Sequence, residues 1–393
     1  MAKNRDVVLV LIITVLYHTM NQMFVPTLPI YIAERGGSEV VVGALVGLLS
    51  LGAIASKWYF GKLSTRSSSL LVLRIGLVLA AAVIVLYFPF WGFGFLALVR
   101  LLQSIGLAGY VTGGQGVLAE NTKPANRGFY FGVFAAMIGV GMTVGPLLGS
   151  YLAENYGYQA LFSGATLVVG AAAVLSFGMG RGASSVKPGM GRRYQPHPPW
   201  KNRKLLVVSG TMLMAASVIG ATSSMLALHA RAVGLGNGSL FFSLFALTFT
   251  LGGAAAGTLS DRFGRSALIV PGFCLLILGL VLLAMLNGTV LLILSAVAAG
   301  LGLGSINAVL LAMVPDCSIS EVDAANDLAF FSNAFDVGVV FGSLGLSALA
   351  AWSYSLFWAA VAVLNVLGLI FYLKYGPEKD TAKFGVKAKE AQF

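Results

Sequence analysis

The sequence alternates between long apolar runs and short polar connections. Twelve of the apolar runs are long enough to cross a bilayer core of about 30 Å at a helical rise of about 1.5 Å per residue. These runs fall at about residues 7–32, 41–61, 70–90, 92–119, 128–153, 157–179, 205–229, 238–258, 266–286, 288–313, 326–350 and 352–374. Helices satisfy their backbone polar groups internally, as a bilayer core requires. The pattern therefore predicts an all-α membrane protein with twelve transmembrane helices.

The composition supports the same class. Of the 393 residues, 58% are hydrophobic and only 10% are charged, and soluble domains do not have this balance. The formal net charge of +11 would suit a nucleic-acid-binding protein, but the basic residues lie in short loops and tails between the apolar runs. We therefore expect the lipid bilayer and a small-molecule substrate as partners, no nucleic acid, and a monomeric protein.

The basic residues also predict the orientation in the membrane. Lysines and arginines gather in the loops and tails on the side that holds both termini, whereas only Arg35 and Arg231 fall in the opposite loops. By the positive-inside rule both termini are cytoplasmic, and the protein is integral to the plasma membrane, which in bacteria is the inner membrane. The first run continues past His18 to about Ile32 without a small-residue cleavage site, which predicts a retained helix and not a signal peptide.

An internal repeat divides the chain into two halves. Gly61-Lys-Leu-Ser-Thr-Arg66 follows the second run, and Gly257-Thr-Leu-Ser-Asp-Arg262 follows the eighth run, 196 residues later. Duplicated transporter halves hold their substrate between them near the membrane midplane. We predict an N-terminal six-helix bundle at 1–180, a cytosolic linker at 181–204, a C-terminal six-helix bundle at 205–375 and a cytosolic tail at 376–393.

A glycine stripe marks the fifth apolar run. Gly141, Gly145 and Gly149 recur at every fourth position, so a helix presents them on one face, where another backbone can approach closely. Pro146 lacks an N–H group and allows the helix to bend. A similar pair of glycines lies in the eleventh run. The stripe is either a generic packing face or a surface on which the two halves rock, and we predict the second.

Three segments carry glycine together with either a proline or charged residues at recognisable spacings. They are Gly139-Val-Gly-Met-Thr-Val-Gly-Pro-Leu-Leu-Gly-Ser150, Gly257-Thr-Leu-Ser-Asp-Arg-Phe-Gly-Arg265 and Arg100-Leu-Leu-Gln-Ser-Ile-Gly106. In these positions they resemble the antiporter signature, the cytoplasmic loop motif and the fourth-helix motif of the major facilitator superfamily, drug:proton antiporter type. The resemblance covers essentially the whole chain. It implies two pseudo-symmetric six-helix bundles that export a solute by alternating access.

The same resemblance implies a cytoplasmic gate. In the family, an acid such as Asp261 at a helix N-terminus and arginines such as Arg262 and Arg265 latch the cytoplasmic face. The first copy departs from this pattern, because Thr65 stands where the aspartate is expected. We therefore expect the second copy to carry more of the gating. The predicted gating residues are Gly61, Arg66, Gly141, Gly145, Pro146, Gly149, Gly257, Asp261, Arg262 and Arg265.

Asp336 is the predicted proton-coupling residue. Counted along the eleventh run it lies about 15 Å deep, and no other carboxylate falls near mid-membrane in the predicted runs. A carboxyl group in a medium of low dielectric constant resists ionisation, so it can bind and release a proton near neutral pH. The alternative is a structural acid that is paired permanently with an arginine or capped by Ser332 and Asn333.

Two further polar residues interrupt apolar runs. Arg100 lies about 12 Å deep in the fourth run, where a charged side chain costs at least about 2.5–3.5 kcal/mol, so it should face the bundle interior and find partners. His18 is either a second proton site or a hydrogen-bonded structural residue. We predict that both residues take part in proton coupling with Asp336.

Polar and aromatic side chains within the runs are candidates for the substrate site. Aromatic residues in such positions also serve plain packing, which is the alternative for each of them. The predicted substrate-binding set comprises Asn21, Gln22, Gln103, Gln115, Asn307, Asn333, Phe331, Phe335 and Tyr110.

The sequence thus predicts a proton-coupled secondary transporter that exports a small organic solute, either drug-like or a metabolite. The alternatives are a proton symporter or uniporter for uptake, and an exporter of a metal-chelating metabolite or a lipid. A membrane enzyme should carry clustered acidic, histidine or serine–lysine groups, and the sequence has none. With two cysteines and three histidines no metal-ligand cluster is visible, so we expect no metal and no cofactor, with the proton as coupling ion.

Overall fold

The computed structural model describes residues 2–66, 68–123, 126–180, 197–319 and 323–377. Within these ranges the regular secondary structure is helical, and no strand occurs. The predicted all-α class is therefore confirmed for the described part of the chain. Most of the predicted linker and tail lie outside these ranges, so the predicted domain boundaries stay predictions.

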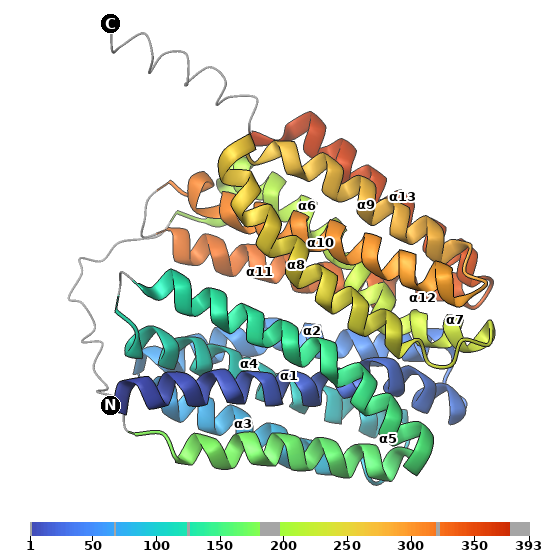
Figure 1. The fold of residues 1–393 in the computed structure, drawn as a ribbon, viewed down its shortest axis with the longest axis horizontal. Coiled ribbons are helices and arrows are strands. Elements are labelled where there is room, and N and C mark those ends of the chain that lie inside the picture. The colour runs from blue at the N-terminus through green and yellow to red at the C-terminus, as the bar shows by residue number, and fades with distance from the viewer. Residues whose placement is uncertain (1, 67, 124–125, 181–196, 320–322, 378–393) are drawn as a thin grey trace, which may run out of the picture.

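Five helices make up the N-terminal half. They are α1 (Ala2–Glu34), α2 (Glu39–Arg66), α3 (Ser69–Val85), α4 (Phe93–Asn121) and α5 (Arg127–Phe177). The 51 residues of α5 form two limbs, because Gly157 leaves the helical conformation with φ 81° and ψ 173° and the chain turns back there (Figure 1). Glycine adopts positive φ at little steric cost, so it suits this tight reversal.

The C-terminal half repeats this plan with two interruptions. Its helices are α6 (Arg203–Ala221), α7 (Ala227–Ala232), α8 (Ser239–Phe263), α9 (Ser266–Ala284), α10 (Thr289–Cys317), α11 (Ala324–Val340), α12 (Ser347–Ala350) and α13 (Tyr354–Tyr375), preceded by the short 3₁₀ turn η2 (Pro199–Lys201). The π-helical segments η3 (Thr222–Leu226) and η4 (Phe341–Gly345) join α6 to α7 and α11 to α12. Such π-helical insertions are frequent at functional sites in helical proteins.

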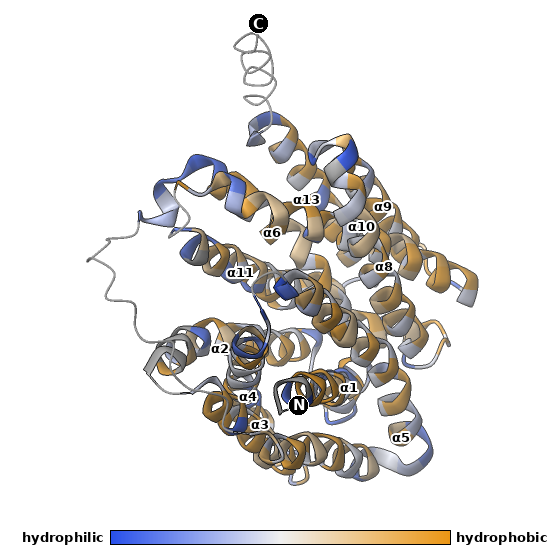
Figure 2. Cartoon of the chain, turned by 60° about the vertical axis from the view of Figure 1, so that its left-hand side comes forward, coloured by the Kyte–Doolittle hydropathy of each residue, from blue (hydrophilic) through white to orange (hydrophobic). Residues whose placement is uncertain are grey.

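The number of spans agrees with the sequence pattern. Among the described residues, ten helical stretches are long and apolar enough to cross a membrane, with α5 counted once and α6–α7 and α11–α12 each counted as one. The second limb of α5 and the shorter apolar helix α3 bring the total to the predicted twelve. Figure 2 shows hydrophobic residues along the lengths of the helices and hydrophilic residues mainly near their ends.

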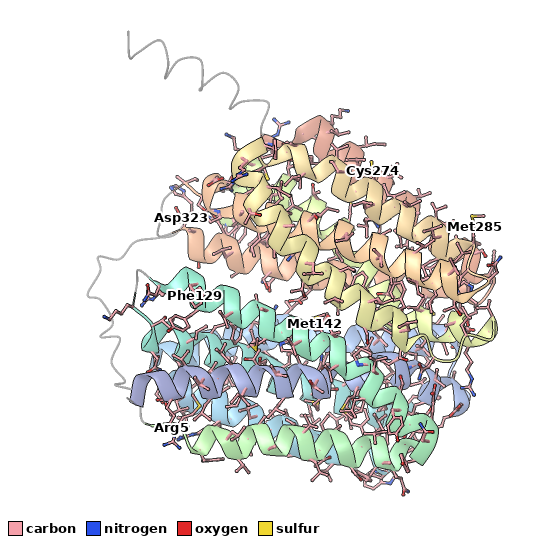
Figure 3. All side chains as sticks on the ribbon, viewed as in Figure 1. Arg5, Phe129, Met142, Cys274, Met285 and Asp323 are labelled. Carbon is pink, nitrogen blue, oxygen red and sulfur yellow. The ribbon has the colours of Figure 1, made fainter. Side chains whose placement is uncertain are left out.

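The two halves lie side by side, and the ends of the bundle differ. In Figure 1 the helices of the N-terminal half occupy the lower part and those of the C-terminal half the upper part, and α1 begins at the left end of the bundle. We call this end the terminal end, and the opposite one, which holds the turn at Gly157, the distal end. Arg5, Phe129 and Asp323 lie at the terminal end and Met285 at the distal end (Figure 3).

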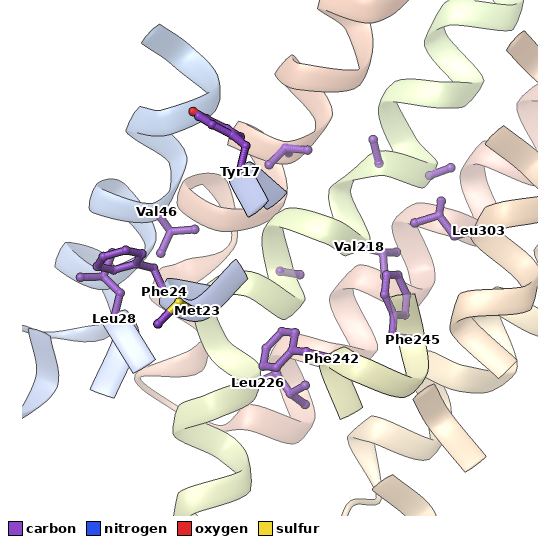
Figure 4. Close-up of a cluster of buried hydrophobic side chains, with 14 of the residues drawn as sticks. Tyr17, Met23, Phe24, Leu28, Val46, Val218, Leu226, Phe242, Phe245 and Leu303 are labelled. Atoms are coloured by element: carbon purple, nitrogen blue, oxygen red, sulfur yellow. The ribbon is translucent and has the colours of Figure 1, made fainter. Parts of the chain in front are cut away.

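The larger of two apolar clusters among the described residues runs through both halves. It joins Tyr17, Phe24 and Val46 of the N-terminal half to Phe242 and Phe245 of α8 in the C-terminal half (Figure 4). Because burying apolar side chains gains little between helices in lipid, close packing of small residues has to position the helices against one another.

The glycine stripe of α5 provides such packing, although not where the sequence analysis placed it. A Cβ atom on Gly141, Gly145 or Gly149 would lie 2.3–2.7 Å from atoms of α1, so the stripe packs against α1 within the same half. The matching Gly338 and Gly342 pack in the same way against α6. The prediction that these stripes form the rocking surface between the halves is therefore wrong in this structure, and the packing-face alternative holds.

Candidate functional site

A cavity of about 240 Å³ lies between the two halves. Its walls come from α1, α2 and α4 on one side and from α6, η3 and α11 on the other. The described lining residues are Asn21, Gln22, Phe24, Val25, Leu28, Val46, Leu49, Ser50, Arg100, Leu107, Ile219, Ser223, Phe335, Asp336 and Val339. An apolar pocket with a few converging polar groups is the usual form of a small-molecule site.

The cavity brings together five residues that the sequence analysis singled out. Asn21 and Gln22 of α1, Arg100 of α4, and Phe335 and Asp336 of α11 all line it. These positions are far apart in the sequence, and they meet because both halves turn their polar faces toward the same space.

The other predicted substrate residues do not line this cavity. Gln103, Tyr110 and Phe331 are buried in the packing, Asn307 and Asn333 are half-buried, and Gln115 is exposed. The last three lack a described contact that would connect them to the cavity. Their assignment to the substrate site stays a prediction without support from this geometry.

The carboxylate of Asp336 forms an ion pair with Lys57 of α2, which belongs to the opposite half. The Lys57 ammonium also donates a hydrogen bond to the hydroxyl oxygen of Ser332, one turn before Asp336, at 3.0 Å. The Lys57 side chain is 31% exposed and that of Asp336 is 11% exposed. Asp336 is therefore paired with a lysine, and not with an arginine as the alternative prediction had it. Ser332 contacts this lysine and does not cap the acid.

The sequence analysis missed Lys57, although a signal for it existed. The residue lies inside the second apolar run, where a lysine is costly unless it has a counter-charge or reaches the interface. Asp336 is a buried acid that needs such a partner. Pairing the intramembrane charges by sign would have suggested this contact.

Arg100 is buried and hydrogen-bonded, as expected from its depth. The residue is 5% exposed. Its Nε atom donates to the carbonyl of Leu45 at 2.9 Å and Nη2 donates to that of Val46 at 3.3 Å, both on α2. Nη1 donates to Oε1 of Gln103 at 3.1 Å. The prediction that Arg100 faces the interior and finds partners is confirmed, whereas its part in proton coupling stays a prediction.

Gln103 serves as a support for Arg100. Its Oε1 atom also accepts a hydrogen bond from the Tyr87 hydroxyl at 2.6 Å, so the amide orientation is defined by two donors. The same side chain is fully buried and its Nε2 atom has no hydrogen-bond partner in the described structure. Gln103 thus orients the arginine from behind the cavity wall.

His18 lies in a separate aromatic cluster inside the N-terminal half. Its ring is 5.7 Å from that of Tyr110 and 6.0 Å from that of Tyr17, centre to centre, and the two tyrosine rings stack at 3.9 Å. The Nε2 atom of His18 is buried without a hydrogen-bond partner in the described structure. The structure therefore does not connect His18 to the Asp336 ion pair, and its role in proton coupling stays a prediction.

A second bridge between the halves lies at the distal end. Arg231 of α7 donates from Nη1 to Oε1 of Glu34 at the end of α1, at 2.6 Å. Both side chains line a cavity of about 370 Å³ that also includes Glu154, Gly157 and Tyr158. Among the described residues, the halves are therefore joined by one ion pair at the distal end and by another beside the central cavity.

The predicted gating motif is only partly visible. Gly257 lies inside α8 with open space around it, and Gly264 at φ 86° makes the turn. Arg265 bridges to the Asp316 carboxylate and the Ala312 carbonyl at the end of α10, as expected for a carboxylate-bridging arginine.

The remaining predicted gating residues have different surroundings. Arg262 is exposed, and the side chains of Arg66 and Asp261 and the surroundings of Gly61 lie outside the described part. Pro146 lines a small cavity of about 50 Å³ between the halves, together with Met142 and three phenylalanines of α8, Phe242, Phe245 and Phe249. Met142 faces the level where the halves meet (Figure 3).

Among the described residues, no group of three or more histidine, cysteine or acidic side chains is arranged to hold a metal ion.

Comparisons with known proteins agree with this architecture. The family model of the Major Facilitator Superfamily matches residues 10–238 and 205–392. The chain is 25% identical over 381 residues to the multi-drug resistance efflux pump PmrA of Streptococcus pneumoniae. This match covers 89% of this chain and 91% of that protein. It is 29% identical over 168 residues to the multidrug resistance protein MdtG of Proteus mirabilis, and this match spans 41% of each protein.

Solved structures share the fold at low sequence identity. The nucleoside transporter NupG has a TM-score of 0.78 at 14% identity, over 94% of this chain and 98% of that chain. A bacterial homologue of the human lysosomal transporter Spinster, in an inward-facing and occupied conformation, has a TM-score of 0.78 at 14% identity, over 95% and 97% of the two chains. Two related helical halves around a central cavity, and a family match along nearly the whole chain, lead to one conclusion: the chain belongs to the major facilitator superfamily and is a membrane transporter, not an enzyme.

Proposed function

We propose that this transporter exports a small organic solute by alternating access in exchange for protons, with Asp336 as the proton-binding residue. The observation that carries the proposal is the ion pair between Asp336 and Lys57, because it joins the two halves at the wall of the central cavity. An acid in this place can link its proton to the movement of the halves.

The chemistry of the pair gives the direction of this linkage. When Asp336 is ionised, its attraction to Lys57 holds α11 against α2. A proton that binds to the carboxylate removes the negative charge and with it most of the attraction. Lys57 lies seven residues beyond Ser50 of the cavity wall, toward the terminal end. Protonation therefore favours separation of the halves on the terminal side.

The orientation of the chain converts this linkage into antiport. Under this proposal the terminal end faces the cytosol, as the basic loops and tails predict by the positive-inside rule. A proton taken up from outside then opens the carrier to the cytosol, where the proton leaves and the solute binds. The ionised Asp336 re-forms its pair with Lys57, the cytosolic side closes, and the solute is released outside once the Glu34–Arg231 bridge parts.

Relatives support the export direction. PmrA of Streptococcus pneumoniae is named a multi-drug resistance efflux pump, and the quinolone resistance protein NorA of Staphylococcus aureus is 25% identical over 132 residues. Under this proposal Asn21, Gln22 and Phe335 contact the solute from the cavity walls.

Gradient-driven transport in proteoliposomes tests the proposal. We suggest measuring 2-naphthoate, norfloxacin and ethidium, so that an anion, a zwitterion and a cation are all offered under an imposed pH gradient. Asp336→Asn is expected to abolish the dependence of transport on the gradient. Asp327→Asn, the same substitution at a buried acid of the same helix away from the cavity, is the matched control and should retain it. Full gradient-driven antiport by Asp336→Asn would refute the role of this residue.

Uptake is the second candidate, because the structural neighbour NupG is a nucleoside transporter. The sign of solute accumulation in intact cells distinguishes the two directions. Export lowers the internal concentration in expressing cells, and uptake raises it. Export of a metal-chelating metabolite or a lipid remains within the proposed class and differs only in the solute.

A further inference from the structure

The central cavity carries an unbalanced positive charge. Among its described lining residues, only Arg100 and Asp336 are charged. The charge of Asp336 is matched by Lys57 across the halves. None of the ion pairs among the described residues includes Arg100.

The partners of Arg100 are all neutral. The carbonyls of Leu45 and Val46 and the amide oxygen of Gln103 accept three of its N–H groups. A guanidinium group has five N–H donors, so two remain for another acceptor. Neutral acceptors stabilise the donors but leave the net charge of the buried guanidinium in place.

From this charge balance we propose that the transported solute is an amphipathic organic anion, whose carboxylate or other oxyanion group binds Arg100. The apolar body of the solute lies against side chains such as Phe24, Leu28 and Phe335, which form most of the remaining wall. The inference rests on the proposed function, because it assigns a substrate class to the same cavity.

Arginine suits this role, because its planar fork of donors matches the geometry of an oxyanion. Gln103 and the two α2 carbonyls hold the guanidinium in place, so little side-chain entropy is lost when an anion binds. A cation in the same cavity would face Arg100 and would have to displace Lys57 from Asp336. A neutral solute would leave the charge of Arg100 unbalanced.

Equilibrium binding to the full-length protein in lipid nanodiscs tests this assignment. The probes are 2-naphthoate, 2-naphthalenesulfonate, 2-naphthamide and 2-naphthylmethylammonium, which share one apolar body and differ in charge. We expect both anions to bind at least about tenfold more tightly than the amide, and the ammonium most weakly. Equal affinities, or preference for the ammonium, would overturn the proposal.

A charge series at the ion pair makes the test independent of Arg100, whose replacement could disturb the packing of α2 and α4. Asp336→Asn leaves the charges of Lys57 and Arg100 together, so the preference for the anions over the amide should rise by about tenfold. Lys57→Gln with Asp336→Asn removes the second positive charge and should return the preference to its native value. An unchanged preference across this series would contradict the charge argument.

Two further outcomes separate this inference from neighbouring ones. Dihexanoyl phosphatidate carries the same anionic chemistry on a lipid, and its binding in the absence of any binding by the naphthalene anions would overturn assignment to a free solute. The measurements are made at equilibrium without a gradient. Anion-selective binding together with transport that does not depend on the pH gradient would therefore refute the proposed coupling and leave the substrate class standing. Gradient-dependent transport without anion-selective binding would refute the substrate class and leave the coupling standing.

Discussion

The ion pair between Lys57 and Asp336 predicts how pH changes the conformation of the transporter. The pair joins α2 to α11, and Ser332 holds the same lysine at 3.0 Å. Replacing Asp336 with Asn keeps the size of the side chain and removes its charge. We expect the two halves of this variant to be separated at the terminal end at every pH.

The size of the effect follows from the surroundings of the pair. Two unit charges about 4 Å apart attract by about 4 kcal/mol at an effective dielectric constant of about 20. The Lys57 side chain is 31% exposed, so solvent screens part of this attraction. We therefore take about 2 kcal/mol, which corresponds to a change of roughly thirtyfold in the equilibrium between closed and open arrangements of the terminal end.

Spin labels on the outer parts of the two helices can measure this equilibrium. Tyr59 of α2 and Leu328 of α11 are exposed positions on either side of the pair, and the native Cys274 and Cys317 are first replaced by serine. Acidification should move the native protein toward longer distances, because the attraction is present only while Asp336 is ionised and is lost when its carboxylate binds a proton. Asp336→Asn should show the longer distances throughout.

A charge exchange provides the control. Lys57→Asp with Asp336→Lys re-forms a pair of opposite charges with the acid on α2, so the short distance and its dependence on pH should return. The reasoning is refuted if Asp336→Asn keeps the short distance of the native protein at high pH, or if it opens on acidification as the native protein does.

Further predictions concern the packing and the distal bridge. Gly342→Val should destabilise the protein by about 1–3 kcal/mol, seen as a lower melting temperature, because a Cβ atom there would lie 1.8 Å from the Ser217 carbonyl oxygen. Gly257→Ala has open space and a helical backbone, so its stability should stay level or rise by up to about 1 kcal/mol, and a loss of transport at unchanged melting temperature would reveal a gating role. Glu34→Gln should change the melting temperature little, since its bridge to Arg231 is exposed and worth about 0–1 kcal/mol, and any shift in the open population should vanish at high salt.

Several features of the protein could be predicted from local sequence alone. Hydropathy along the chain predicted twelve spans, because each span has to satisfy the same bilayer thickness independently of its neighbours. The depth of Arg100 predicted its burial, since an arginine inside an apolar run has to face polar partners. The same argument about depth singled out Asp336, which the structure places in the cavity wall.

The contacts between helices required the tertiary structure. Lys57 and Asp336 are separated by 279 positions, and Arg100 reaches carbonyls 54 and 55 positions away. Sequence spacing shows that Gly141, Gly145 and Gly149 share one face, but it does not show that this face meets α1 of the same half. The same limit explains why Gln103 and Tyr110, although polar and at suitable depth, face the packing and not the cavity.

The sequence by itself thus determined that this chain crosses the membrane twelve times in two related halves and carries a buried acid and a buried arginine. Only the tertiary structure decided that a lysine of one half neutralises the acid of the other, and that the arginine keeps its charge. The physical reason is that hydropathy and depth are properties of each helix alone, whereas the choice of a partner depends on the rotation and position of two helices relative to each other.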